Sequence, residues 1–234
     1  MATTGKANYA PLPLRIRPLT RLTQLYLGLA AYAVSMVLMV EARLGNQPWD
    51  VFHQGIAVRT GLSLGMVTII VGAVVLLLWW PLRQRPGLGT LSNVLVIGAV
   101  FDLADAVIPT PSLLWQRIGF LVAGVLLCAV ASGLYIGARL GPGPRDGLMT
   151  GLAARGHSIR LARTVIEVSV VAVGFLLGGT LGIGTIVYAL AIGPLVQLTL
   201  PLFTTRERAV SAELTADAAA RPVVAEATPE HAGS

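Results

Sequence analysis

The chain has 234 residues, of which 55% are hydrophobic and only 12% are charged, and its mean hydropathy is +0.75. Soluble domains carry about 25% charged residues, so this composition excludes an ordinary soluble protein and indicates a polytopic membrane protein. The net charge of +6 fits basic cytoplasmic loops better than nucleic-acid binding, and the single cysteine, Cys128, excludes a disulfide framework.

The two ends of the chain differ in composition from its middle. Residues 1–21 contain three prolines and three arginines but lack the compact apolar run of a cleavable signal peptide. Residues 204–234 are rich in Thr, Glu, Ala and Pro, a composition too polar to order itself. We predict a disordered cytoplasmic leader over 1–21, a single membrane domain over 22–203 and a disordered cytoplasmic tail over 204–234.

Six stretches approach the roughly 20 apolar residues that a helix needs to cross a bilayer. They are residues 22–40, 64–82, 91–107, 118–136, 163–179 and 182–202. With the N-terminus inside, only Arg43, Arg59 and Arg117 of the 17 basic residues fall outside. Because Lys and Arg gather in cytoplasmic loops, we predict an all-α multi-pass protein of about six transmembrane helices with both termini in the cytoplasm.

One segment of the chain occurs twice. Ala-Arg-Leu-Gly at 42–45 returns at 138–141, and each copy continues to a proline and an aspartate. Later positions keep matching after one deletion, which predicts two related halves at about 22–108 and 117–203. The matched pairs include Pro48 with Pro144, Asp50 with Asp146, Gly89 with Gly184, Thr90 with Thr185 and Gly98 with Gly193.

The two halves are predicted to be inverted. Each contains three spans, and an odd number makes consecutive halves cross the membrane in opposite directions. Trp49, Leu64 and Val67 of the first copy are replaced by Arg145, Arg160 and Arg163 in the second, where that copy faces the cytoplasm. Inverted repeats are the architecture of many secondary transporters.

Each half carries a short element between its first two spans. Trp49, Phe52 and Ile56 fall at helical spacing, which predicts an amphipathic helix that either lies in the interface or enters the membrane as a re-entrant hairpin. The repeated glycine, proline and aspartate are typical of one helix ending and another beginning. A compatible alternative is that the paired Asp and Arg residues line a substrate or ion path.

Ionisable and polar residues in or beside the spans are the candidates for such a path, because their burial is costly. Glu167 has a structural alternative, since Arg163 lies four residues earlier and an i,i+4 pair would neutralise it. The candidate path residues are Arg43, Asp50, Asp102, Arg139, Asp146, Glu167 and Gln197.

Signatures of catalysis are scarce in the sequence. It contains no Walker loop and no His-Glu-x-x-His. Gly-x-Ser-x-Gly at 61–65 opens a span instead of following a strand, so Ser63 is predicted to be a helix N-cap. We expect no enzyme activity, no catalytic residue, no cofactor and no metal site.

Three stretches resemble the YczE-type bacterial membrane proteins, which look related to the broader YitT group. They are Leu-Tyr-Leu-Gly-Leu at 25–29, Pro-Trp-Asp-Val-Phe-His-Gln-Gly at 48–55, and the run at 133–151 that contains Gly-Pro-Gly-Pro-Arg-Asp-Gly. The resemblance covers about 22–203 and implies an integral protein of the bacterial plasma (inner) membrane. It implies no particular activity, substrate or site residue.

These observations predict a secondary transporter or exporter of an unknown small molecule, embedded in the lipid bilayer. Two alternatives stay open. Six spans without an energy motif also fit a substrate-binding membrane subunit that works with a separate ATPase, docked on the basic inner surface around residues 139–163. The other is a non-transporting scaffold for a biosynthetic system. A homo-oligomer is compatible with each.

Overall fold

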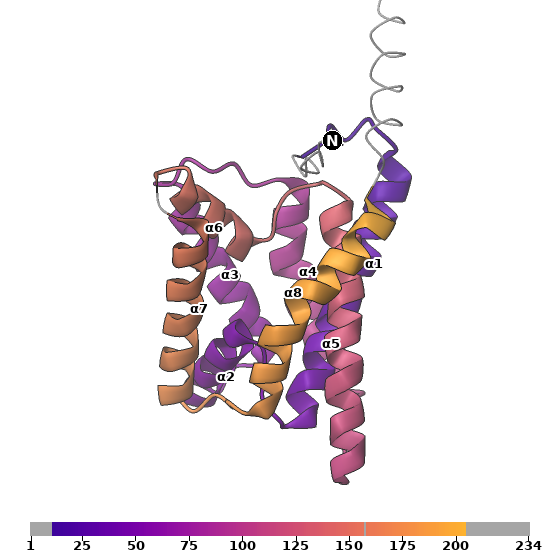
Figure 1. Ribbon diagram of the computed structural model, residues 1–234, viewed down its shortest axis with the longest axis vertical. Coiled ribbons are helices and arrows are strands. Elements are labelled where there is room, and N and C mark those ends of the chain that lie inside the picture. Colours follow the sequence, from indigo (N-terminus) through magenta and orange to yellow (C-terminus); the bar gives the residue numbers. More distant parts are fainter. Residues whose placement is uncertain (1–10, 157, 205–234) are drawn as a thin grey trace, which may run out of the picture. The chain divides into compact units, whose positions relative to one another are not determined.

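The computed structural model describes residues 11–156 and 158–204, so residues 1–10 of the predicted leader and 205–234 of the predicted tail lie outside the described residues. Within the described part all regular structure is helical, which confirms the predicted all-α class. Figure 1 shows the eight described helices: α1 (Pro18–Ala42), α2 (Pro48–Thr60), α3 (Leu64–Trp79), α4 (Leu88–Asp105), α5 (Leu114–Gly137), α6 (Pro144–Ala153), α7 (Ile159–Leu176) and α8 (Ile183–Phe203).

Four of these helices, α1, α4, α5 and α8, are long and apolar enough to cross a membrane by length and composition. α2 and α3 together form a fifth candidate, bent by 114° at their junction. α3 alone has 16 residues, and α7, with 18, carries Arg160, Arg163 and Glu167. On these criteria the described residues offer four or five spans instead of the predicted six, because one helix is short and another is interrupted by charge.

α1 and α5 form an antiparallel pair. Arg117, near the start of α5, donates from Nε to the carbonyl oxygen of Ala42 at the end of α1 over 2.8 Å. Gly28, in the first half of α1, instead faces Tyr135 near the end of α5. A Cβ on Gly28 would lie 2.7 Å from the Tyr135 backbone nitrogen, so a glycine is needed for this close approach. The buried apolar core, which includes Leu29, gathers around the pair.

Residues 11–21 differ from the predicted disordered leader. α1 already begins at Pro18, and the chain before it lies against the end of α5. The Arg21 side chain, 1% exposed, donates to the carbonyl oxygens of Ala138 and Arg139 and to three carbonyls of residues 12–16. A hydropathy pattern does not predict this contact, because the contact depends on one arginine that donates to backbone carbonyl oxygens of residues far away in the sequence.

The two copies of the repeated segment adopt the same backbone conformation. Arg43 and Arg139 follow α1 and α5 with φ of 51° and 53°, and Gly45 and Gly141 follow with φ of 119° and 130°. Positive φ at the second position favours glycine because that residue has no Cβ. The predicted helix-stop pattern is thus confirmed in both copies.

Each of these segments docks on the last helix of the other half. The Leu44 carbonyl accepts a hydrogen bond from the Gly184 backbone N–H over 2.7 Å, and the Leu140 carbonyl accepts one from the Gly89 N–H over 2.9 Å. Both the acceptors and the donors occupy matched positions in the two halves. The same contact is therefore made twice, as expected of two related halves, whereas their orientation in a membrane stays a prediction.

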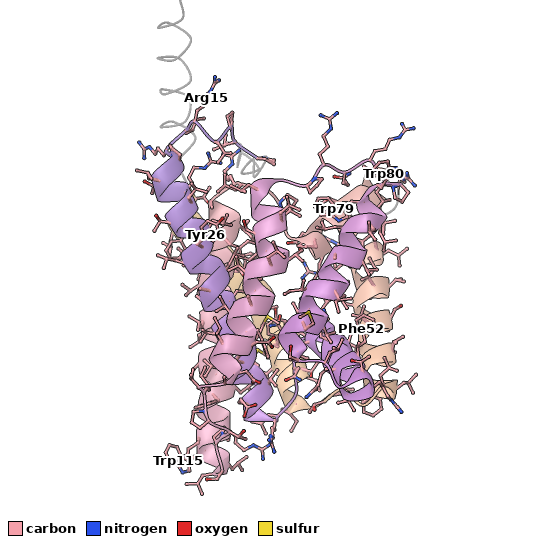
Figure 2. All side chains as sticks on the ribbon, turned by 180° about the vertical axis from the view of Figure 1, so that it is seen from behind. Arg15, Tyr26, Phe52, Trp79, Trp80 and Trp115 are labelled. Atoms are coloured by element: carbon pink, nitrogen blue, oxygen red, sulfur yellow. The ribbon has the colours of Figure 1, made fainter. Side chains whose placement is uncertain are left out.

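The short helices α2 and α6 also pack on the opposite half. α2 lies against α7, where a Cβ on Gly174 would come 2.5 Å from the Phe52 backbone. α6 lies against α3, where the Trp79 indole N–H donates to the Pro144 carbonyl oxygen over 3.0 Å. Figure 1 shows α6 in the upper part of this helical unit and α2 in its lower part, and Figure 2 labels Phe52 and Trp79, which make these contacts.

Candidate functional site

The N-terminal turns of α2 and α6 meet at one cavity of about 310 Å³. Pro48 and Pro144 stand in the first turn of their helices, as the helix-start pattern predicts, and both line the cavity. All eight described helices contribute lining residues. The two copies of the repeated element therefore start at opposite ends of the helical unit and converge on a shared space.

Trp49 and Arg145, which occupy matched positions, stack on each other in the lining of this cavity. The Arg145 guanidinium carbon lies 5.0 Å from the centroid of the Trp49 ring, a cation–π arrangement. Its Nη2 lies 3.8 Å from Oδ1 of Asp50, and Nδ1 of His53 lies 3.6 Å from the same oxygen. Arg145 is thus attracted to the carboxylate at a distance longer than a hydrogen bond.

Asp50 is fully buried, and neither of its carboxylate oxygens has a hydrogen-bond partner among the described residues. A buried carboxylate without hydrogen bonds is costly. The Asp50 side chain therefore does not serve as a saturated helix cap, although its position in the first turn of α2 places it beside the positive end of the helix dipole.

A second polar cluster surrounds Gly143, the N-cap residue of α6. A Cβ on Gly143 would lie 3.3 Å from Oδ2 of Asp146 and 3.8 Å from both Nδ2 of Asn93 and the Tyr135 hydroxyl oxygen. Asp146 is exposed to the cavity and has no ion-pair partner within 4.0 Å among the described residues. The Asp146 carboxylate, the Asn93 amide and the Tyr135 hydroxyl therefore lie close together around the start of α6, and all three residues line the cavity.

Gln47 occupies the position in α2 that Gly143 occupies in α6. Its side chain is 2% exposed, and its Oε1 accepts a hydrogen bond from the Tyr32 hydroxyl over 3.0 Å. Its Nε2 lacks a partner among the described residues, and Gln47 lines the cavity. The first half thus contributes a buried donor at the position where the second half has a glycine.

Arg163 and Glu167 of α7 line the same cavity and form an ion pair, with 2.9 Å between Nε and Oε1. This confirms the predicted i,i+4 pairing, which accounts for the glutamate by local neutralisation. Both side chains are partly exposed, at 61% and 32%.

The cavity opens on the side of the second half. Its exposed lining residues are Asp146, Arg163, Ala189 and Gly193, from α6, α7 and α8. α3 packs on α4, whereas α7 and α8 do not pack along their lengths. A Cβ on Gly98 of α4 would lie 2.5 Å from the Gly65 carbonyl oxygen, but a Cβ on the matched Gly193 of α8 would meet nothing within 4 Å.

Asp102 stands away from the cavity, where it holds the start of α3. Its carboxylate accepts hydrogen bonds from the Ser63 hydroxyl over 2.7 Å and from the Gly65 backbone N–H over 2.8 Å. Ser63 in turn accepts from the Met66 N–H over 3.2 Å, which confirms the predicted N-cap. These contacts give Asp102 a cross-helix capping role.

The sequence-predicted path residues thus divide into two groups. Asp146 and Glu167 line the cavity, and Asp50 lies beside its lining residues Arg145 and His53. Outside the lining stand Asp102, the exposed Arg43 and Gln197, and the buried Arg139.

Several cavity residues were not among the predicted path residues. The repeat contains a signal for Arg145 and Trp49 as candidate site residues, because a tryptophan in the first copy is replaced by an arginine at the matched position of the second. Gln47 and His53 belong to the same element but have no charged counterpart in the second copy. The tyrosines lie in apolar helices, where spacing alone does not distinguish a cavity-facing from a lipid-facing side chain. They are Tyr32, Tyr135 and Tyr188.

Comparison with known proteins identifies relatives along most of the chain. The model of the "Family of unknown function (DUF6198)" matches residues 19–201. An "Uncharacterized protein" of Haemophilus influenzae is 40% identical over 177 residues, which are 75% of this chain and 81% of that protein. The "Uncharacterized membrane protein YczE" of Bacillus subtilis is 32% identical over 184 residues, 77% of this chain and 86% of the relative.

A third relative, the "Uncharacterized protein YyaS" of Bacillus subtilis, is 24% identical over 184 residues, 75% of this chain and 90% of that protein. No solved structure matches the chain. The relatives confirm the resemblance that the repeated motifs carry and the assignment to membrane proteins.

Proposed function

This chain belongs to the DUF6198 family of membrane proteins, and from that premise we propose that it is a small secondary transporter of the bacterial plasma membrane. The observation that supports the proposal is the central cavity into which both repeated short helices direct their N-terminal turns. Secondary transporters commonly bind substrate at the interface of two repeats, with helix N-termini pointing at the site.

We further propose that the halves are inverted, with both termini in the cytoplasm. α1 starts beside the end of α5, so these two matched helices run in opposite directions. Leu44 of the first half contacts Gly184 of the second, and the matched Leu140 of the second half contacts Gly89 of the first. The uneven distribution of arginine supports the orientation. In this arrangement α2 and α6 approach the cavity from opposite faces of the membrane.

Access to the cavity alternates because the two halves can exchange their packing. In the described state α3 and α4 are closed on each other at Gly98, and the cavity opens beside Gly193. The related sequence of α7 and α8 allows the converse state, in which they close and α3 separates from α4. The two states differ in packing between the same elements, as in other transitions between bistable interfaces.

A cysteine-accessibility experiment tests this function without knowledge of the substrate. Cys128 is replaced by alanine, and Gly193→Cys places a thiol at a cavity-lining position with free space around it. A membrane-impermeant maleimide is then added to one face of oriented vesicles at a time. A carrier predicts that Gly193→Cys reacts from both faces.

Two loop variants serve as controls for sidedness. Leu62→Cys lies between α2 and α3 and Arg85→Cys lies between α3 and α4, and both positions are exposed. Each should react from one face only, and the two faces should be opposite. Reaction of Gly193→Cys from a single face would contradict alternating access and favour a scaffold.

A subunit that depends on an ATPase would show reaction from the second face only when that enzyme and ATP are added. The arginine-rich surface predicted to dock such a partner is smaller than the sequence suggested. Arg139 is buried and Arg145 lines the cavity, which leaves Arg155, Arg160 and Arg163 exposed. We therefore prefer the autonomous carrier.

A further inference from the structure

We propose that the cavity binds a small zwitterion, a molecule that carries one carboxylate and one ammonium group, as a free amino acid does. This inference rests on the proposed function, because it names the ligand class of the same cavity. It is carried by two polar subsites that remain incomplete within the described residues and that lie on the two repeated elements.

The first subsite presents hydrogen-bond donors. Gln47 lines the cavity with a buried Nε2 that has no partner among the described residues. Arg145 lines it as well, and its 3.8 Å separation from Asp50 leaves its guanidinium donors available. Both belong to the N-terminal turns of α2 and α6, whose dipoles favour negative charge. A ligand carboxylate would satisfy this set of donors.

The second subsite presents acceptors. Asp146 is exposed to the cavity without an ion-pair partner among the described residues. The Tyr135 hydroxyl oxygen is a second acceptor near this carboxylate, since a Cβ on Gly143 would lie 3.3 Å from Oδ2 of Asp146 and 3.8 Å from that hydroxyl. A ligand ammonium group that enters the cavity beside Asp146 would pair with the carboxylate.

The charges around the cavity disfavour a ligand that carries only positive or only negative charge. Two cations, Arg145 and Arg163, and two anions, Asp146 and Glu167, line the cavity, so its lining carries no net charge, and Glu167 is paired with Arg163. A lone cation beside Asp146 would still face Arg145, and a lone anion beside Arg145 would face Asp146. Consecutive helical residues project in different directions, so the two charges address the two ends of one ligand.

The remaining walls fit a compact ligand. Trp49, Val75, Met149 and Tyr188 line the cavity and offer apolar and aromatic surface to the body of the ligand. The volume of about 310 Å³ lies at the lower end of small-molecule pockets, which span about 300–1,000 Å³. A single amino acid is therefore favoured over a long peptide.

The test measures thermal unfolding of the full chain in nanodiscs with three matched ligand pools. The first pool contains the common amino acids with uncharged side chains, the second their amides, which lack the carboxylate, and the third their N-acetyl forms, which lack the ammonium group. We expect the amino-acid pool alone to raise the Tm. An equal rise with the amides or the N-acetyl forms, or no rise with any pool, would overturn the proposal.

Three variants locate the effect. For the most stabilising amino acid, Arg145→Gln and Asp146→Asn should each raise the Kd at least about tenfold, because each leaves one ligand charge unpaired. Gly143→Ala should weaken binding, because its Cβ would lie 3.3 Å from Oδ2 of Asp146 and crowd that carboxylate, while its φ of −61° suits alanine. The exposed Arg85→Gln and Asp105→Asn are the controls of matched chemistry and should bind as the unmodified chain does.

Arg145→Lys guards against a folding defect, since it keeps the positive charge and should retain measurable binding where Arg145→Gln does not. Equal binding by Arg145→Gln and the unmodified chain would contradict the carboxylate subsite. The outcome is independent of the labelling experiment. Zwitterion binding together with one-sided labelling would contradict the carrier function and support the ligand class. Two-sided labelling without zwitterion binding would support the carrier function and contradict the ligand class.

Discussion

Gly98 of α4 and Gly193 of α8 occupy matched positions in the two halves, but their surroundings differ. A Cβ on Gly98 would lie 2.5 Å from the Gly65 carbonyl oxygen and from the Ile69 side chain, while a Cβ on Gly193 would meet nothing within 4 Å. One half is closed at this level and the other is open beside the cavity. Related sequences thus adopt two packings, and that is what an exchange between two states requires.

Replacing each glycine by alanine should give the largest contrast. Gly98→Ala forces α3 and α4 apart and is expected to lower the free energy of unfolding by about 1–3 kcal/mol. Gly193→Ala should change it by no more than about 1 kcal/mol, and in the stabilising direction, since alanine favours a helix. Titration with SDS in mixed micelles measures both free energies of unfolding. Equal destabilisation by the two substitutions would contradict the difference in packing between the two glycines.

The matched pair Asp102 and Gln197 sharpens the same contrast. Asp102 accepts hydrogen bonds from Ser63 and Gly65 at the start of α3, whereas Gln197 is exposed. We expect Asp102→Ala to cost about 1–2 kcal/mol through loss of this cap. Gln197→Ala should stay within about 0.5 kcal/mol of the unmodified chain. The same SDS titration measures both changes. An unchanged free energy of unfolding for Asp102→Ala would favour a different role for this carboxylate.

The two short helices are anchored by different groups. Trp79 donates to the Pro144 carbonyl oxygen of α6, while the Gln54 side chain of α2 accepts from Asn46 and from the Thr180 N–H over 2.9 and 2.7 Å. Trp79→Phe keeps most of the packing but removes one buried donor, so it should cost about 1 kcal/mol. Hydrogen exchange of α6 should rise and that of α2 should not. Uniform exchange of both would contradict separate anchoring.

The smallest effect is expected at the mouth of the cavity. Arg163 and Glu167 form a partly exposed i,i+4 pair, and such pairs contribute about 0.3–0.5 kcal/mol. Glu167→Gln should therefore change the free energy of unfolding by less than about 0.5 kcal/mol, with little further change in 0.5 M salt because exposed charges are screened. A loss above 2 kcal/mol would show that the pair holds α7 in place.

Much of this architecture is readable from the sequence where the signal is local. The repeated glycines, prolines and aspartates predict both short helices, Ser63 is a predicted N-cap, and Arg163 is placed one turn from Glu167. Each depends on residues within a few positions of one another, for which helix geometry alone sets the neighbours.

The remaining features depend on contacts between distant segments. Arg21 orders residues 12–16 only because the end of α5 lies beside it, and Asp102 becomes a cap only because α3 starts next to it. Likewise, the convergence of Gln47 and Gly143 on one cavity follows from the docking of each short helix on the opposite half. Hydropathy and spacing contain no information on those distances.

Distances within the two matched helix pairs test the exchange of packing most directly. In a Cys128→Ala background, spin labels are placed at 70 and 95 on α3 and α4, or at the matched positions 166 and 190 on α7 and α8. We predict a main population in which the first pair is close and the second distant, a second population with the two exchanged, and a shift between them on ligand binding. A single distance for each pair, unchanged by any ligand pool, would contradict alternating access.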